Sequence, residues 1–237
     1  METDKKYKLT DETIFVYGIT LYRIEAIKDF DSIKKGDKGG FVENEENLSQ
    51  NGNCWIYDDA KVYGYAKVFG NAQVYNNANI YNNAKVYNNA MVEGNAKVFG
   101  DAWIYDNATI YGNAKICGNA VVYGNAKVYE DAKVFGDANI YGDAYIASDS
   151  DYIVFKNWWS SGRYFTWTRS NNMWKVGCFY GTGEELIEKA YKDSELSGRE
   201  YERVVKYVES ILKDGNTTTK VNKIKQCLLK IVKKFNL

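Results

Sequence analysis

Apolar and polar residues alternate with a fixed period of six through the middle of the chain. From Ala60 to Ala144 an alanine returns at every sixth position, and a valine or isoleucine follows each alanine two positions later. The same register extends upstream, where Val42, Leu48 and Cys54 hold the alanine position. Self-similarity at a short fixed period is typical of a solenoid, in which each repeat packs only against its neighbours.

The hexad excludes a helix and predicts short strands. Glycine or asparagine recurs in the repeats and β-branched residues dominate the apolar position, which disfavours helix and favours strand. In each Ala-x-Val-Tyr unit, the alanine and the valine lie on the same side of an extended chain. The Gly-Asn, Asn-Asn or Gly-Asp pair that follows tolerates positive φ and allows a sharp turn. Three hexads would therefore close one triangular coil, stacked about 4.8 Å from the next.

This pattern divides the chain into a solenoid and its flanks. It predicts a β-helix of about six coils over residues 42–149, preceded by a small β cap over residues 1–41. Residues 150–214 lose the hexad and predict an α+β module with three strands followed by two helices. The two helices would begin at the capping boxes that open with Thr182 and Ser197.

Residues 215–237 predict a basic amphipathic helix. Its apolar residues keep a three-four spacing, and no acidic residue follows Asp214. The lysines that surround the apolar stripe are Lys220, Lys223, Lys225, Lys230, Lys233 and Lys234. We interpret this segment as a packing or oligomerisation helix with a solvated lysine face. Binding to anionic lipid or to nucleic acid is the alternative.

The hexads resemble the repeat of the hexapeptide left-handed β-helix superfamily, in which a small inward residue follows an aliphatic one by four positions. The match is nearly unbroken from Val62 to Ile146. The flanks GDKGGFVENEENLSQNGNCWIYDDA, from Gly36, and GCFYGTGEELIEKA, from Gly177, are similar to hexapeptide-repeat proteins of bacteria, phages and prophages. The resemblance implies a left-handed parallel β-helix and a parallel trimer, and it implies acyl transfer as the first activity to consider.

Histidine is absent from all 237 residues. Imidazole is the usual general base near neutral pH and the commonest metal ligand. Acyltransferases of the superfamily generally use a histidine base, and β-helices of the carbonic anhydrase type use histidine ligands. We therefore expect no such enzyme, no metal and no cofactor. Glu93 and Cys178 are the remaining alternatives for a base and a nucleophile, and we interpret them as a surface residue and a core residue.

Net charge and cysteine spacing indicate which partners and which cellular compartment to expect. The formal net charge is zero, so we expect no nucleic-acid partner. The cysteines are far apart, which favours free thiols in a reducing compartment: Cys54, Cys117, Cys178 and Cys227. The start METDKKYKLTDET is polar, and no apolar run reaches the roughly 20 residues of a membrane span. We expect a cytoplasmic protein, in the host cytoplasm if a phage encodes it.

Two faces of the predicted prism carry candidate binding residues. The first face stacks three lysines at one-coil spacing, which is repulsive unless anions or acidic neighbours intervene: Lys97, Lys115 and Lys133. The alternative is a solvated lysine face that only prevents edge aggregation. The second face has an apolar centre that predicts self-association: Trp103, Tyr105, Val121 and Tyr123. The alternative there is that the C-terminal module covers this patch.

A further candidate site is the segment KNWWSSGRYFTWTR, which begins at Lys156. It combines planar rings, small polar residues and guanidinium groups suited to phosphate: Trp158, Trp159, Ser160, Ser161, Arg163 and Arg169. In the phage proteins that this chain resembles, a Gly, Ser and Arg cluster also follows the first strand of the module. That resemblance carries over to Arg163, whereas the order here is Ser-Gly-Arg. A hairpin core is the alternative interpretation of the two tryptophans.

These observations favour a non-catalytic homotrimeric protein that binds a small anionic ligand. The resemblance to phage and prophage proteins implies a nucleotide, such as a cyclic nucleotide immune signal, that the protein would sequester against host defence. The alternative is a structural or assembly scaffold without a small ligand. A degenerate acyltransferase is the third interpretation.

Overall fold

The computed structural model describes residues 5–213. The predicted basic helix over residues 215–237 and Cys227 lie outside the described residues. The chain divides into two compact units. The first contains the chain up to Asn157 together with Gly162–Tyr180, and the second contains Trp158–Ser161 and the chain from Gly181 onward.

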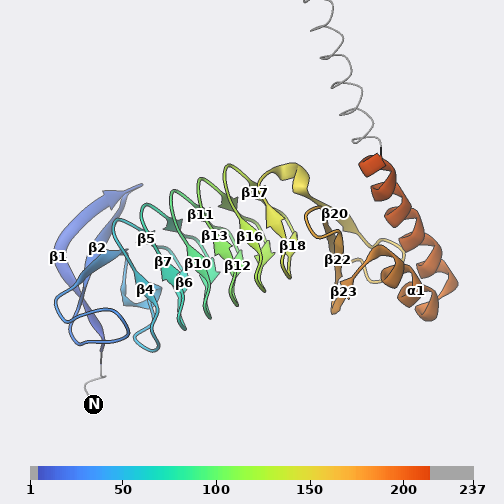
Figure 1. Ribbon diagram of the computed structural model, residues 1–237. Coiled ribbons are helices and arrows are strands. Elements are labelled where there is room, and N and C mark those ends of the chain that lie inside the picture. Colours follow the sequence, from blue (N-terminus) through green and yellow to red (C-terminus); the bar gives the residue numbers. More distant parts are fainter. Residues whose placement is uncertain (1–4, 214–237) are drawn as a thin grey trace, which may run out of the picture. The chain divides into compact units, whose positions relative to one another are not determined.

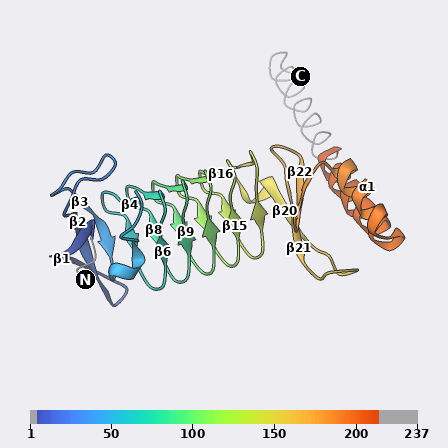
Figure 2. The same ribbon diagram turned by 90° about the horizontal axis from the view of Figure 1, so that it is seen from below.

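The first unit is built around a solenoid of about six coils, as the hexads predict (Figures 1 and 2). Each coil contributes one short strand to each of three parallel sheets. The strands are two residues long, shorter than the four-residue units expected from the sequence. The flanking residues still bond from coil to coil, since Lys61 N–H donates to the carbonyl of Ala78 at 2.9 Å and Tyr63 N–H donates to the carbonyl of Ile80 at 3.0 Å. The predicted mainly β fold class is therefore confirmed.

The sheet of the first face contains eight strands and joins the solenoid to the N-terminal cap. Its solenoid strands are β5 (Lys61–Val62), β8 (Asn79–Ile80), β11 (Lys97–Val98), β14 (Lys115–Ile116) and β17 (Lys133–Val134). Its cap strands are β1 (Tyr7–Val16), β2 (Ile19–Ala26) and β3 (Lys38–Val42). β3 pairs in parallel with β5, so the predicted start of the repeat near Val42 agrees with the register.

The other two faces contain only solenoid strands. The second face is formed by β6 (Lys67–Val68), β9 (Lys85–Val86), β12 (Trp103–Ile104), β15 (Val121–Val122) and β18 (Asn139–Ile140). The third face is formed by β4 (Trp55–Ile56), β7 (Gln73–Val74), β10 (Met91–Val92), β13 (Thr109–Ile110), β16 (Lys127–Val128) and β19 (Tyr145–Ile146).

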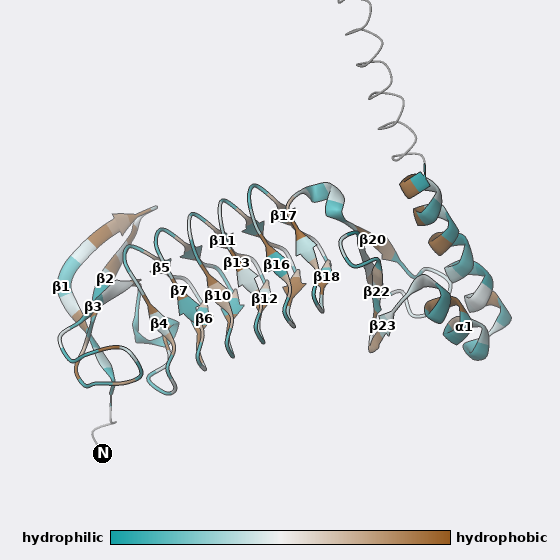
Figure 3. Ribbon diagram, viewed as in Figure 1, coloured by the Kyte–Doolittle hydropathy of each residue, from teal (hydrophilic) through white to brown (hydrophobic). Residues whose placement is uncertain are grey.

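The alanine and aliphatic positions of every hexad form one continuous core. From Ala60 to Ile146 these side chains are at most 1% exposed. Hydrophobic residues lie on the strands, whereas the turns between them are polar (Figure 3). Asn82 and Asp106 occupy turns at φ of 59° and 56°, where the short polar side chain tolerates the left-handed conformation. The sharp turns predicted from the Gly and Asn pairs are confirmed.

The two ends of the solenoid carry antiparallel strands. β1 pairs with β2 in two stretches, Tyr7 to Leu9 and Thr13 to Val16, with a shift of register between them. At the other end, a short 3₁₀ turn (Asp149–Asp151) leads into β20 (Tyr152–Lys156), β21 (Tyr164–Thr168), β22 (Met173–Val176) and β23 (Phe179–Gly181). This sheet has four strands rather than the three predicted, because a turn at Gly177, where φ is 55°, separates β22 from β23. The same turn leaves Cys178 exposed, so its interpretation as a core residue was wrong.

The described part of the second unit, which ends at residue 213, contains two helices. α1 (Gly183–Asp193) begins at the predicted capping box, in which Thr182 and Glu185 exchange side-chain to backbone hydrogen bonds. The second helix occupies residues 195–213 of the described chain. It begins after Ser194, whose hydroxyl accepts the backbone N–H of Ser197 at 3.1 Å, rather than at the capping box predicted at Ser197.

Candidate functional site

The lysine column, defined as Lys97, Lys115 and Lys133, follows the first face from coil to coil. Lys97 pairs with Lys115 and Lys115 pairs with Lys133 in the parallel register of β11, β14 and β17. Lys97 is half-buried, and the other two side chains are exposed. Like charges directly opposite one another on neighbouring strands are destabilising. The three stacked lysines therefore make these strands less stable than neutral residues at the same positions would.

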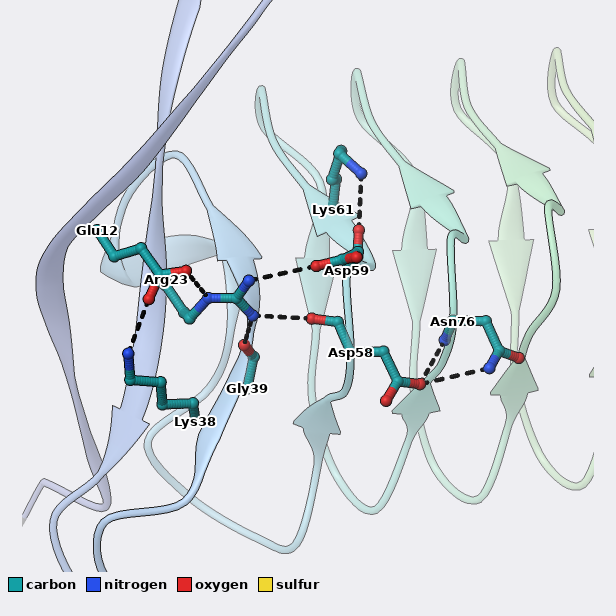
Figure 4. Close-up of polar contacts among 8 residues, drawn as sticks. All are labelled: Glu12, Arg23, Lys38, Gly39, Asp58, Asp59, Lys61 and Asn76. Atoms are coloured by element: carbon teal, nitrogen blue, oxygen red, sulfur yellow. Dashed lines mark hydrogen bonds and ion pairs between the residues drawn. The ribbon is translucent and has the colours of Figure 1, made fainter.

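The N-terminal part of the same face also carries cations, but these are paired with carboxylates and carbonyls. Arg23 on β2 donates from Nε to Glu12 Oε1 at 2.6 Å and from Nη2 to Asp59 Oδ1 at 3.2 Å (Figure 4). Its Nη1 donates to the carbonyls of Gly39 at 2.8 Å and Asp58 at 3.0 Å. The planar guanidinium thereby joins two cap strands to the first coil.

Two lysines beside Arg23 have acceptors as well. Lys38 Nζ donates to Glu12 Oε2 at 2.8 Å, and Lys61 Nζ donates to the carbonyl of Asp59 at 2.7 Å (Figure 4). Hydrogen bonds from Lys38 and from Arg23 draw the pKa of the Glu12 carboxyl below its ordinary value. The cations at this end of the face thus hold the cap on the solenoid.

Within residues 5–213, the lysine column has no such acceptor. None of its three ammonium groups forms an ion pair or a side-chain hydrogen bond with another described residue. Asp149 is bonded to the column only through the main chain, because its Oδ1 accepts the backbone N–H of Lys133 at 2.7 Å. Among the described residues, therefore, no carboxylate forms an ion pair with the lysine column.

Aromatic side chains run beside the lysines, two residues further along each strand segment. On this face the sequence order is Tyr63, Tyr81, Phe99, Cys117 and Phe135. Leu21 and Phe41 of the cap pack on Tyr63, which is only 7% exposed. The cap does not cover Phe135, which is 55% exposed. The lysine column thus lies beside the open part of this aromatic row.

The structure divides the second candidate cluster between the two compact units. Trp158, Trp159, Ser160 and Ser161 belong to the second unit, whereas Arg163 and Arg169 belong to the first. The ring of Trp159 packs edge-on against Tyr201 of the second helix, with the centroids 4.9 Å apart. Arg169 donates from Nε to the carbonyl of Ser150 at 3.2 Å. Neither unit by itself contains the predicted six-residue site.

The predicted self-association patch lies on β12 and β15 of the second face. Trp103 is 41% exposed, and its ring lies 4.6 Å from the ammonium group of Lys85. Tyr105, Val121 and Tyr123 are half-buried. Val121 lies opposite Trp103 in the sheet, and the ring of Tyr123 stacks on that of Tyr105.

The C-terminal sheet reaches the upper edge of this patch. Lys175 on β22 lies 5.9 Å from the ring of Tyr123 and 5.1 Å from the ring of Tyr141. Burial lowers the pKa of Lys175. The patch is therefore open at Trp103 and partly covered at Tyr123, and no sequence pattern pointed to Lys175.

Grooves elsewhere on the solenoid follow its corners. One groove of about 560 Å³ lies between the second and third sheets and is lined by glycines and by Asn71, Asn88, Asn89, Asp106, Asn107 and Asn125. Its amides already bond to one another from coil to coil: Asn71 Nδ2 donates to Asn89 Oδ1 at 3.1 Å, and the bond repeats up to Asp143. We interpret this amide row as a support for the turns.

A buried lysine at the N-terminal end also has a structural role. Lys6 Nζ donates to the carbonyls of Gly52 at 3.0 Å and Cys54 at 2.8 Å, and it lies 3.3 Å from Cys54 Sγ. Burial lowers the pKa of Lys6 and raises the pKa of Cys54. The ammonium group thus closes the loop that precedes the first full coil.

Other site types find little support in the described chain. In residues 5–213, no group of three or more Cys, Asp or Glu side chains is placed to hold a metal ion. No helix in that range is long and apolar enough to cross a membrane. Glu93 is half-buried on the third face, in line with Tyr75 and Tyr111 of the neighbouring coils.

Comparisons with known proteins concern the repeat. Residues 114–130 match a family model described as the YdcK beta solenoid repeat. A protein named uncharacterized acetyltransferase YdcK, from Escherichia coli strain K12, is 38% identical over 66 residues, which are 24% of this chain and 20% of that protein. The chain thus spans about a fifth of the length of this relative. Together with the parallel solenoid of hexads, these matches fit the resemblance to hexapeptide-repeat left-handed β-helix proteins.

Proposed function

We propose that this protein is a non-catalytic binding protein whose lysine column holds an anionic ligand. The single observation that carries the proposal is that Lys97, Lys115 and Lys133 are stacked without a carboxylate partner among the described residues. An anion bound along the column would remove the repulsion between the ammonium groups and form charge-assisted hydrogen bonds with them. A small phosphorylated ligand, such as a nucleotide, fits this requirement, and sequestering it would be the biological role.

The proposal excludes acyl transfer as the main activity, although the relative from Escherichia coli is named an acetyltransferase. The chain has no histidine to serve as a general base. Acetyl-CoA carries phosphates and an adenine ring, so binding without transfer would be compatible with this proposal. Release of free CoA from acetyl-CoA in the presence of an amine or alcohol acceptor would contradict it.

We also propose that the protein self-associates through the second face. The support is the exposed Trp103 beside the half-buried Tyr105 and Val121, an apolar centre on an otherwise polar prism. The family resemblance points to a parallel trimer.

The binding proposal is tested with a charge-matched pair of double variants. Lys115→Gln with Lys133→Gln removes two cations from the lysine column, whereas Lys85→Gln with Lys127→Gln removes two cations that lie over rings on the other faces. Calorimetry at low salt measures the affinity for inorganic tripolyphosphate. We expect a loss of at least tenfold in the first variant and less than twofold in the second, and added salt should weaken binding because the site is exposed.

Equal losses in the two variants would show nonspecific charge attraction and overturn the proposal. No binding of tripolyphosphate by the wild type would overturn it as well and favour the scaffold interpretation. Native mass spectrometry of the same samples reports the oligomeric state and any ligand that co-purifies.

A further inference from the structure

The solenoid carries three rows of outward aromatic rings, and these rows differ in continuity. On the second face the row is unbroken, with centroid distances of 4.7 Å from Phe69 to Tyr87, 4.9 Å to Tyr105, 4.7 Å to Tyr123 and 4.4 Å to Tyr141. Rings therefore stack at the spacing of the coils wherever each hexad supplies one. Offset or parallel stacking of this kind is favourable beyond simple burial.

On the first face the row is interrupted once. Tyr63 stacks on Tyr81 at 5.2 Å, and Tyr81 stacks on Phe99 at 4.9 Å, with interplanar angles of 5° and 3°. The next coil has Cys117 in the aromatic position, and the following coil has Phe135. A thiol thus replaces one ring in an otherwise aromatic row.

The interruption leaves two rings separated by two coils. By strand spacing, Phe99 and Phe135 are about 9–10 Å apart, which is twice the distance between stacked rings in the row. A planar ring from another molecule, placed over Cys117, would lie one coil spacing from each of them. It would therefore continue the row with the geometry that the protein's own rings adopt.

The lysines around Cys117 favour a molecule that carries negative charge. Lys115 lies two residues before Cys117, on the outward side of β14, with Lys97 and Lys133 directly opposite it on the neighbouring strands. Phosphate attached to the inserted ring would thus reach the lysine column. The third face has a comparable interruption at Glu93, but there the replacing residue is itself an anion.

The cap and the C-terminal strands limit the site to this one position. On the N-terminal side of Phe99, Ile14, Val16 and Ile19 of the β1–β2 hairpin pack on the cluster that contains Tyr63, and Tyr81 packs on the same cluster. Above, the ring of Phe135 meets Tyr152 edge-on at 6.4 Å and 76°, so the stack does not continue upward. The coil of Cys117 is the one between these limits that lacks a ring.

We infer that the first face binds one planar, phosphorylated heteroaromatic molecule, a nucleotide, with its ring over Cys117 between Phe99 and Phe135. The phosphates lie on Lys97, Lys115 and Lys133. This inference rests on the proposed function, since the same lysines bind the anion, and it adds the class of the ligand. No bond forms or breaks, because the thiol serves only as the small residue that leaves room for the ring.

The test is to supply the missing ring from the protein itself. Cys117→Phe gives this coil the residue found at positions 99 and 135 and should continue the stack without disturbing the core. Glu93→Phe is the matched control, since it fills the interruption on the third face. Cys117→Ala keeps the position small and removes only the thiol. Calorimetry compares ATP with inorganic tripolyphosphate, which has the same phosphates without a base.

We expect the wild type to bind ATP at least tenfold more tightly than tripolyphosphate. Cys117→Phe should lose that difference and keep its affinity for tripolyphosphate, whereas Glu93→Phe and Cys117→Ala should bind both probes like the wild type. If Cys117→Phe does not fold, Phe99→Ala provides the second variant: it removes one stacking partner and should weaken ATP binding several-fold but not tripolyphosphate binding.

Failure of the inference is distinguishable from failure of the proposed function. If the wild type binds tripolyphosphate and ATP equally, or if Cys117→Phe and Phe99→Ala leave the preference for ATP unchanged, the ring site is wrong and the lysine site stands. If the wild type binds neither probe, both are wrong. A loss of ATP binding in Cys117→Ala would show that the thiol acts on the ligand and would overturn the role of a simple spacer.

Discussion

The two halves of the first face use the same kinds of residue for different purposes. In the N-terminal half, Arg23 and Lys38 are bonded to Glu12, Arg23 is also bonded to the first coil, and the ring of Tyr63 is buried against Leu21 and Phe41 of the cap. In the C-terminal half, the lysine column has no described carboxylate partner, and the row of aromatic rings is exposed and interrupted at Cys117. The comparison teaches that charge alone does not mark a binding surface, since only cations that lack internal acceptors are free to bind an external anion.

The largest effect should come from removing a paired cation. Arg23→Met keeps the apolar stem of the side chain but leaves Glu12, Asp59 and two carbonyls without their donor. Hydrogen bonds to charged groups contribute about 1.5–3 kcal/mol each, so we expect a net loss of about 2–3 kcal/mol, since several groups remain partly solvated. Urea unfolding followed by circular dichroism measures it. A loss below about 0.5 kcal/mol, the level of an ordinary surface change, would contradict the structural role.

The matched change in the C-terminal half should have the opposite sign. Lys115→Met removes the central charge of the lysine column and with it the repulsion from Lys97 and Lys133. We expect the free energy of unfolding to rise by about 0.5 kcal/mol at low salt, in line with cross-strand pair energies. High salt should reduce the gain, because it screens the wild-type repulsion. A clear loss of stability would mean that Lys115 has an internal partner after all.

The smallest effect concerns the response to alkaline pH. Burial, with a smaller contribution from the nearby Tyr81 and Tyr17, raises the pKa of Tyr63 to about 12 from an ordinary value of 10.0. Because the folded pKa lies above the unfolded one, the neutral phenol contributes its full stability below pH 10, and the contribution is lost as the pH rises through about 12. Tyr63→Phe should make the fall in stability between pH 10 and 12 less steep.

Tyr105 provides the comparison on another face, since burial also raises its pKa to about 12. Tyr105→Phe should therefore also reduce the fall in stability between pH 10 and 12, by a similar amount. Thermal unfolding measured at several pH values between 9 and 12 checks both variants. If the stability of Tyr63→Phe falls with pH as steeply as that of the wild type, the cap does not exclude water from this ring.

Much of the fold could be predicted from the sequence because the hexad is a local rule repeated many times. The inward positions of alanine and the branched residues, the turns at Gly and Asn, and the capping box of Thr182 all depend on neighbours within a few residues. The predictions that were wrong concern segments outside the hexad repeat. The helix start at Ser194 and the exposure of Cys178 depend on single turns that compete with similar signals nearby.

The sequence by itself determined the parallel solenoid, its buried rows and the stacking of Lys97, Lys115 and Lys133, because a fixed period places equivalent residues one above another. Only the tertiary structure decided which cations are paired and which rings are covered. Arg23 and Asp59 are 36 positions apart and meet through the docking of the cap, which no local pattern encodes. For the same reason, the open interruption at Cys117 emerged only when the extent of that cap was known: long-range packing, rather than periodicity, decides which part of a repetitive surface remains available.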